Sequence, residues 1–261
     1  MPSSTFAPDG TLDIHRGNIV SCVGKKGSGK SIVGLMLFKS YPRDKVVIDI
    51  AGDDGPIGPD VIDLHGDVET LPRKWPEHLR VDDRPMILRY FPDAGSSTFL
   101  ADMDAVVGMA MAHQHCCILV HEMGRLAPAN QTPPHTMRVL QHNRHQGVTA
   151  IFCMPRPKTI DTLVIGQSDL IYVFETPSPL DRQRLAEVMG WPPKGLAESV
   201  DELQAHEYLR FDSNEPKPKE GEIDMRLLHF PPLPKEVVDD VKRWASGWRP
   251  APDPRGTDHA G

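Results

Sequence analysis

One run of eight residues constrains this chain more than any other feature. Between an apolar stretch at 18–23 and a helical pattern that begins at residue 30, the sequence reads Gly24, Lys25, Lys26, Gly27, Ser28, Gly29, Lys30 and Ser31. The three glycines let the backbone turn so that successive N–H groups point inward at an anion. In this pattern Lys30 reaches the β- and γ-phosphates, and the hydroxyl of Ser31 ligates Mg²⁺. The run therefore predicts a phosphate-binding loop (P-loop) for ATP or GTP with Mg²⁺.

The rest of the apolar pattern predicts an α/β fold. Short runs that are apolar on both faces alternate with segments of helical spacing. We expect strands at 18–23, 45–50, 86–90, 116–120, 148–153 and 170–174, and helices at 30–41, 97–113, 132–146 and 181–189. Strands that are apolar on both faces belong to parallel sheets with helices on either side. The pattern predicts a P-loop NTPase with a mainly parallel sheet covered by helices on both faces. In the third helix, Thr132 and Pro133 are expected as the N-cap and N1 residues.

The chain divides into two expected parts. Residues 1–213 carry the alternating pattern and are expected to form the ATPase domain, with a Gly-, Pro- and Asp-rich insertion at 51–85. Acidic residues outnumber basic ones in that insertion by 9 to 4, which argues against DNA binding there. Residues 214–261 are expected to form a Pro-rich extension, with one short amphipathic helix at 235–244 and a disordered tail from residue 250.

Composition and charge exclude several classes of protein. No apolar run approaches the ~18 residues that span a bilayer, and the first ten residues lack the pattern of a secretory signal. We therefore expect no membrane contact and a cytoplasmic location, in the host cytoplasm if the source is viral. All four cysteines lie in apolar contexts, which favours buried thiols in a reducing compartment. The net charge of −7 argues against a surface coated in basic charge but allows nucleic acid along a basic channel.

Hydrolysis of ATP needs acidic residues in addition to the P-loop. In P-loop ATPases an apolar strand ends in Asp-Glu, where the Asp holds the Mg²⁺ water and the Glu polarises the attacking water. Here the strand at 116–120 is followed by His121 and Glu122, so a histidine stands where Asp is expected. Because Mg²⁺ prefers oxygen ligands, either Asp49 supplies the missing carboxylate or the metal is held more loosely and turnover is slow. Glu122 is the candidate general base; the alternative is an exposed glutamate at a strand end.

Together these residues resemble the FtsK/HerA superfamily of DNA-pumping ATPases, including its Zot-like and viral genome-packaging branches. The resemblance covers residues 18–189 and includes the P-loop, the strands that end at Asp49 and Glu122, and the segment 143–149. It implies that Arg144 is an arginine finger that reaches the nucleotide of the neighbouring subunit. The alternative is a solvated arginine that interacts with the dipole at a helix end.

The resemblance also implies a γ-phosphate sensor after the strand at 148–153. Arg156 matches the arginine of the family's Gln-Arg-Pro signature, but Pro155 stands where the family has glutamine. Because an arginine finger acts across subunit contacts, the resemblance implies a homo-oligomeric ring, expected to be a hexamer. Its implied partner is double-stranded DNA.

These observations lead to one expected function and two alternatives. We expect an ATP-driven motor that translocates or packages double-stranded DNA in a phage or other mobile element. The first alternative is a nucleotide-dependent switch or scaffold with weak or no hydrolysis, which His121 and Pro155 favour. The second is a small-molecule kinase, but the acidic insertion at 51–85 does not look like the Arg-rich lid such an enzyme needs.

Two patterns are expected to carry no chemistry. The pairs His113/His115 and His142/His145 have spacings that could chelate a metal, but no nearby cysteine or carboxylate in the sequence completes a set. We therefore interpret these histidines as helix and loop residues. The Pro-Pro-Leu-Pro run at 231–234 is interpreted as a connector.

Overall fold

A single nine-stranded sheet runs through the part of the chain that the computed structural model describes, which is residue 14 and residues 17–50, 58–219 and 224–247. Its strand order is β3-β4-β2-β5-β6-β1-β7-β8-β9. The first seven strands in this order are parallel, and β8 and β9 pair antiparallel at one edge, so the predicted mainly parallel sheet is confirmed. The strands are β1 (Ile19–Val23), β2 (Lys45–Ile48), β3 (Ile62–Leu64), β4 (Ile87–Tyr90), β5 (Cys117–Val120), β6 (Thr149–Met154), β7 (Leu170–Val173), β8 (Tyr208–Asp212) and β9 (Leu227–Phe230).

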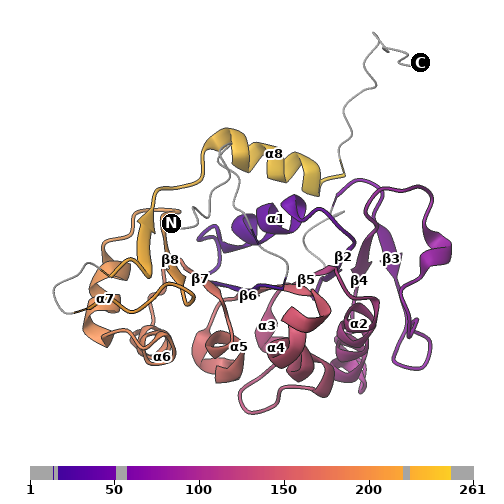
Figure 1. The fold of residues 1–261 in the computed structure, drawn as a ribbon, viewed down its shortest axis with the longest axis horizontal. Helices are drawn as coiled ribbons and strands as arrows, with labels where there is room; N and C mark the ends of the chain where they lie inside the picture. The colour runs from indigo at the N-terminus through magenta and orange to yellow at the C-terminus, as the bar shows by residue number, and fades with distance from the viewer. Residues whose placement is uncertain (1–13, 15–16, 51–57, 220–223, 248–261) are drawn as a thin grey trace, which may run out of the picture.

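Helices cover both faces of the sheet, as predicted (Figure 1). One face carries α1 (Lys30–Ser40) and α8 (Lys235–Ala245). The other face carries α2 (Phe99–His113), α3 (Met123–Leu126), α4 (Pro134–Gln146), α5 (Thr162–Gly166), α6 (Pro179–Met189) and α7 (Pro193–Asp201). Two short 3₁₀ helices, η1 (Glu77–Leu79) and η2 (Pro157–Thr159), lie in connections. Among the described residues, no helix is both long enough and apolar enough to cross a bilayer.

Alternate side chains of the strands build two separate cores. On β1, Ile19 and Val23 pack into the core beneath α2 and α4, whereas Val20 and Cys22 pack beneath α1. This alternation follows from the period of two residues along a strand, and it explains why the central strands are apolar on both faces. All four cysteines are buried and free, which confirms their expected role as core thiols.

The start of α4 differs from the prediction. The helix begins one residue later than expected, with Pro133 as its N-cap, so the assignment of Thr132 as N-cap is wrong. Thr132 instead donates its hydroxyl hydrogen to Oδ2 of Asp161 at 2.9 Å. The buried Asp104 on α2 accepts hydrogen bonds from two N–H groups in the first turn of α4, at 3.0 and 2.8 Å. A carboxylate from another helix therefore replaces the local cap.

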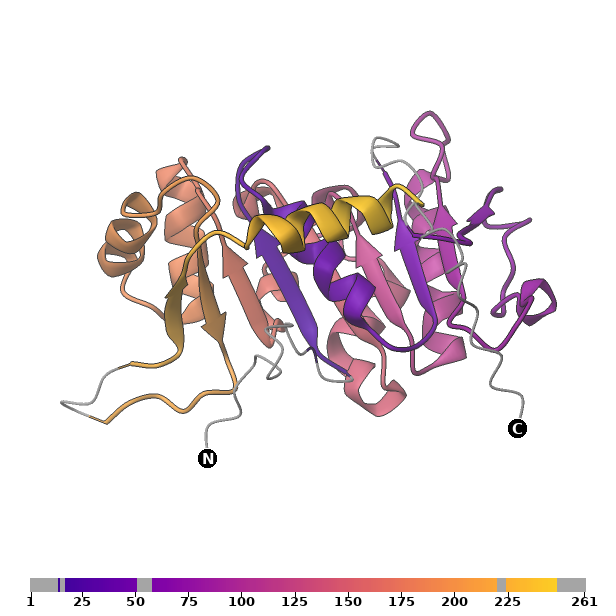
Figure 2. The ribbon, with the colours of Figure 1, turned by 90° about the horizontal axis from the view of Figure 1, so that it is seen from above.

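Parts of the acidic insertion and of the Pro-rich extension join the sheet. Residues 58–85 contribute η1 and β3, which pairs in parallel with β4. Residues 224–247 contribute β9, which pairs with β8, and α8, which matches the helix expected at 235–244. In both views α8 lies over α1 (Figures 1 and 2). The extension therefore packs against the part of the chain that carries the alternating pattern, which ends at residue 213. Residues 51–57 and the expected tail from residue 250 lie outside the described residues.

Candidate nucleotide-binding site

The predicted P-loop follows β1 and is anchored to both neighbouring strands. The N–H of Gly24 donates to the carbonyl oxygen of Met154 at the end of β6, at 3.2 Å. The N–H of Lys25 donates to the carbonyl oxygen of Glu175, just beyond β7, at 2.9 Å. A Cβ on Gly24 would lie 2.6 Å from the Cβ of Phe174, closer than unbonded carbon atoms approach, so only glycine fits there.

The second half of the loop turns into α1 at Gly29, whose φ of 103° and ψ of −7° favour glycine. Among the described residues, no backbone carbonyl accepts a hydrogen bond from the N–H groups of Gly27, Gly29, Lys30 or Ser31. The hydroxyl of Ser28 is buried and also lacks a hydrogen-bond partner within that part of the chain. An anion at a helix N-terminus satisfies donors of this kind. The residues present therefore fit the phosphates of a nucleotide.

Two lysines of the loop make contacts that a phosphate could replace. The Nζ of Lys30 lies 3.3 Å from the carbonyl oxygen of Lys25. The side chain of Lys25 forms an ion pair with Glu175, and both side chains are 46% exposed. Exposed ion pairs contribute little to stability. Both ammonium groups are thus available to an incoming phosphate at a small free-energy cost.

Glu122 lies at the same end of the sheet as the P-loop, where the parallel strands have their C-terminal ends. Only β6 separates β5, which Glu122 follows, from β1. With about 4.8 Å between neighbouring strands, the ends of β1 and β5 lie roughly 10 Å apart. Glu122 is exposed and has a left-handed backbone, with φ 61° and ψ 54°. A non-glycine residue held in this region costs about 1–3 kcal/mol, and such strain is concentrated at functional sites. Its role as general base stays a prediction.

His121 and Asp49 are neighbours beyond the ends of β5 and β2. Ile48 pairs with Val120 in register, so the residues that follow them lie side by side. Both side chains are buried, with His121 4% and Asp49 1% exposed. Because β5 and β6 lie between β2 and β1, the Asp49 backbone lies about 14 Å from the P-loop strand. The sheet order thus places Asp49 three strands from the strand that precedes the P-loop, and its role as a Mg²⁺ ligand stays a prediction.

Arg144 lies at the end of the sheet opposite to the P-loop, where the parallel strands begin. It belongs to the last turn of α4, and a Cβ on Gly17, just before β1, would lie 3.1 Å from its Cα. Its guanidinium forms an ion pair with Asp169, just before β7, and its side chain is 67% exposed. The five residues of β1 span roughly 16 Å between this end and the P-loop. Within one subunit the structure does not bring Arg144 to the nucleotide loop, so its action across subunits stays a prediction.

Pro155 and Arg156 follow β6 at the edge that carries the P-loop. Both residues are exposed. The carbonyl oxygen of Arg156 accepts a hydrogen bond from the hydroxyl of Thr159 at 2.8 Å, which fixes the turn into η2. Because β6 lies between β1 and β5, Arg156 lies between the P-loop and Glu122 along this edge. Arg156 therefore follows the strand next to the P-loop strand, and a sensor role for it stays a prediction.

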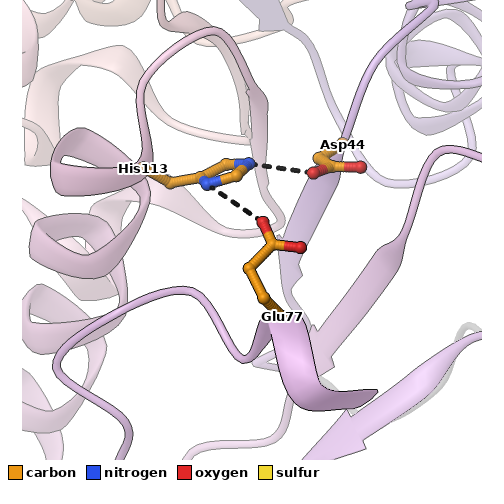
Figure 3. A group of neighbouring side chains, drawn as sticks. All are labelled: Asp44, Glu77 and His113. Atoms are coloured by element: carbon orange, nitrogen blue, oxygen red, sulfur yellow. Dashed lines mark hydrogen bonds and ion pairs between the residues drawn. The ribbon is translucent and has the colours of Figure 1, made fainter. Parts of the chain in front are cut away.

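A charged cluster beside the start of β2, at the end of the sheet opposite to the P-loop, was not predicted (Figure 3). The Nε2 of His113 lies 2.9 Å from Oδ2 of Asp44, and its Nδ1 lies 3.7 Å from Oε1 of Glu77. The three side chains are close enough to hold a metal ion. However, the guanidinium of Arg80 already donates to both carboxylate oxygens of Asp44, at 3.2 and 2.6 Å. A cation in that place leaves no need for a metal, so we interpret the cluster as structural.

Hydrogen bonding lowers the pKa of Asp44 in this cluster. Burial raises the pKa of Asp44, but hydrogen bonds with His113, Arg80 and the N–H of Met86 outweigh burial and hold that pKa well below its usual range. Residues 44, 77 and 113 are far apart in the sequence and follow no motif spacing, so the cluster was not predictable. The fold brings them together from a strand start, a 3₁₀ helix and a helix end.

A cavity of about 370 Å³ opens beside the P-loop. On one side it is lined by Gly27, Gly29, Lys30 and Ser31 of the loop. On the other side it is lined by residues of the C-terminal segment, including Leu233. That wall was not predictable from the sequence, because the proline run around Leu233 carries no helical or strand periodicity.

Solved structures that resemble this chain include genome-packaging NTPases. The genome packaging NTPase B204 from Sulfolobus turreted icosahedral virus 2, in complex with AMPPCP, matches with a TM-score of 0.61 at 18% sequence identity, over 84% of this chain and 100% of B204. Its complex with sulfate matches with a TM-score of 0.62 at 18% identity, over 84% of this chain and 98% of B204. B204, the DNA-packaging ATPase from Sulfolobus turreted icosahedral virus, matches with a TM-score of 0.58 at 17% identity, over 84% and 100%.

These matches concern the fold. No protein family matches the sequence, and no curated protein is similar to it in sequence. Three-dimensional similarity at 18% identity leaves function to be argued from the site itself. The chain shares the α/β fold of the B204 packaging NTPases, which confirms the α/β fold with a mainly parallel sheet that the sequence predicted.

Proposed function

We propose that this protein binds and hydrolyses ATP and uses the free energy to move double-stranded DNA. The main support is the arrangement at one edge of the sheet, where an anchored P-loop, the strained Glu122 and the exposed Arg156 follow three adjacent strands. The B204 proteins that share the fold are described as genome packaging or DNA-packaging enzymes, which supports DNA as the substrate that is moved.

The P-loop residues account for binding of the triphosphate. The N–H groups of Gly27, Gly29 and Lys30 and the ammonium of Lys30 hold the β- and γ-phosphates. The hydroxyl of Ser31 lines the same cavity, and a neutral oxygen donor suits Mg²⁺. Bound Mg²⁺ would neutralise charge that develops on the phosphate oxygens. The same cradle accepts GTP, because it contacts only phosphates.

Glu122 accounts for hydrolysis. Its carboxylate polarises a water molecule whose oxygen attacks the γ-phosphorus, while the bond from that phosphorus to the bridging oxygen breaks. His121 follows the strand where an Asp would help to hold the metal, and imidazole is a poor ligand for Mg²⁺. We therefore expect turnover to be slow compared with that of an ATPase that has both carboxylates.

The position of Arg144 accounts for assembly. An exposed arginine at the edge opposite to the P-loop can stabilise a γ-phosphate only if another subunit's loop lies next to it. We therefore propose a homo-oligomeric ring, expected to be a hexamer, that encloses double-stranded DNA in the cytoplasm. A ring presents basic groups to DNA along its channel, so the net charge of −7 does not oppose this function.

A nucleotide-dependent switch is the second candidate. His121 in place of the metal carboxylate and Pro155 in place of the sensor glutamine both favour binding without efficient hydrolysis. ATP turnover measured with and without double-stranded DNA separates the candidates. Turnover that DNA stimulates supports the motor, tight ATP binding without turnover supports the switch, and turnover that requires a small acceptor supports a kinase.

A further inference from the structure

The C-terminal segment of the chain forms one wall of the cavity beside the P-loop. We propose that this cavity holds the base and ribose of a nucleoside triphosphate, so that residues 231–245 are part of the nucleotide site. The inference rests on the proposed function, because it takes the P-loop as the site of the triphosphate.

The lining of the cavity combines the two chemistries that a nucleotide presents. Lys30 and Ser31 of the P-loop offer a positive charge and a hydroxyl, which suit phosphates. Leu233, Val238 and Phe174 offer apolar surface, which suits a flat base with little charge. The volume of about 370 Å³ falls within the usual range of small-molecule sites.

An aromatic surface lies directly next to the P-loop. A Cβ on Gly29 would lie 3.5 Å from Cε1 of Phe174 and 3.5 Å from Nδ1 of His206. The buried ring of Phe174 packs against Tyr208, with the ring centroids 5.3 Å apart. Because Phe174 is only 1% exposed, it backs the apolar side of the cavity and presents little surface of its own to a base. His206 and Lys242 also line the cavity, and they offer hydrogen bonds to a base edge or to ribose hydroxyls.

Contacts with α1 hold the C-terminal wall in place. Lys39 on α1 forms an ion pair with Asp240 on α8. The rings of Phe38 and Trp244 meet edge to face, with centroids 6.3 Å apart. Val241 is 1% exposed and belongs to the core beneath α8. None of these five residues lines the cavity, so the wall is docked by contacts separate from those that a nucleoside would make.

Binding of ATP and of tripolyphosphate, each with Mg²⁺, tests the inference by calorimetry on the full chain. Val238→Trp fills the cavity from α8, and Leu233→Trp fills it from the preceding loop. The matched control is Asp239→Trp, which places the same ring at an exposed position of α8. We expect both cavity variants to bind ATP roughly tenfold or more weakly, since a displaced base loses its burial against the apolar lining. Tripolyphosphate, which has no base, should bind all variants within about twofold of the unaltered chain.

Several results would overturn the inference. One is a folded cavity variant that binds ATP as the control does; another is an equal loss of ATP and tripolyphosphate binding, which would place the effect at the P-loop. A third is an unaltered chain that binds tripolyphosphate as tightly as ATP. Thermal unfolding identifies any variant that does not fold, and the other cavity variant then decides. Failure of the unaltered chain to bind either compound would instead reject the proposed function itself.

Discussion

Arg144 and Asp169 form an ion pair at the edge of the sheet where β1 and β7 begin. The Asp169 side chain is only 4% exposed, and its second oxygen accepts a hydrogen bond from the N–H of Ile19 at 2.7 Å. A buried carboxylate fixed to the backbone of β1 thus holds an arginine that is largely exposed. This arrangement holds the guanidinium at the surface, where a neighbouring copy of the chain would meet it in the proposed ring.

The first prediction concerns Arg144. Arg144→Ala should retain ATP binding but lose roughly a thousandfold or more in hydrolysis rate, because a finger stabilises charge that appears mainly in the transition state. If the arginine acts across an interface, mixing Arg144→Ala subunits with Lys30→Ala subunits should restore part of the activity. Each defective subunit then supplies what its neighbour lacks at some interfaces.

The mixing assay needs an assembled ring. Light scattering at each protein concentration shows whether the subunits are associated. Absence of rescue in a mixture that is demonstrably assembled would contradict the trans role and leave Arg144 as a solvated helix end that pairs with Asp169.

The second prediction concerns the phosphate cradle. Lys30→Ala should weaken ATP binding by about 1.5–3 kcal/mol, roughly ten- to a hundredfold, because a hydrogen bond to a charged group is lost. Its unfolding transition should not change, because Lys30 is only partly buried at the start of α1. Lys235→Ala, an exposed lysine at the start of α8, is the matched control. Equal ATP affinity in the two variants would refute the assignment of the loop.

The third prediction concerns His121. A carboxylate at this position should bind Mg²⁺ more tightly than imidazole does, so His121→Asp should lower the Mg²⁺ concentration needed for half-maximal turnover and raise the rate. Glu122→Gln in the otherwise unaltered chain should reduce turnover by roughly 10²–10⁴-fold, the usual contribution of a general base. Steady-state ATPase assays over a Mg²⁺ titration measure both effects. Parental rates in Glu122→Gln would show that the base lies elsewhere.

The fourth prediction concerns Asp44 and pH. Because its pKa in the folded chain is held below that of the unfolded chain, the stability it contributes is complete above about pH 4 and is lost as pH falls through the folded pKa. Asp44→Asn should therefore lower the free energy of unfolding by about 1–3 kcal/mol at pH 7, and by less as the pH falls below about 4.

Urea unfolding at pH 7 and at lower pH measures this difference. Glu77→Gln is the matched control, because the Glu77 side chain in the same cluster is 55% exposed and its ion pair should contribute less than about 1 kcal/mol. A loss of stability in Asp44→Asn that does not depend on pH would contradict this explanation.

Local sequence patterns made the P-loop and the strands around it predictable. The P-loop combines glycines, a lysine and a serine within eight residues, and the strand before it and the helix after it are periodic. Apolar runs such as 116–120 predict central strands because both of their faces are buried. The end of that strand indicates Glu122 as the base, and the resemblance supplied the role of Arg144, which no spacing alone indicates.

Features that depend on distant residues were not predictable. Asp104 on α2 caps α4 in place of Thr132, and nothing in the local sequence of α4 indicates that partner. Asp44 and His113 are 69 positions apart and meet only because a strand start and a helix end share one edge of the sheet. The wall formed by Leu233 follows from the packing of α8 on α1, which the proline-rich pattern does not reveal.

Movement along DNA is the central claim, and displacement of a third strand tests it most directly. The unaltered chain is incubated with linear double-stranded DNA that carries a fluorescent triplex-forming oligonucleotide, and release of that oligonucleotide is followed after ATP is added. We predict release with ATP, and no release with the non-hydrolysable analogue AMPPCP or with Lys30→Ala. Hydrolysis of ATP without release of the third strand would contradict the motor, and ATP binding with neither hydrolysis nor release would identify the protein as a switch.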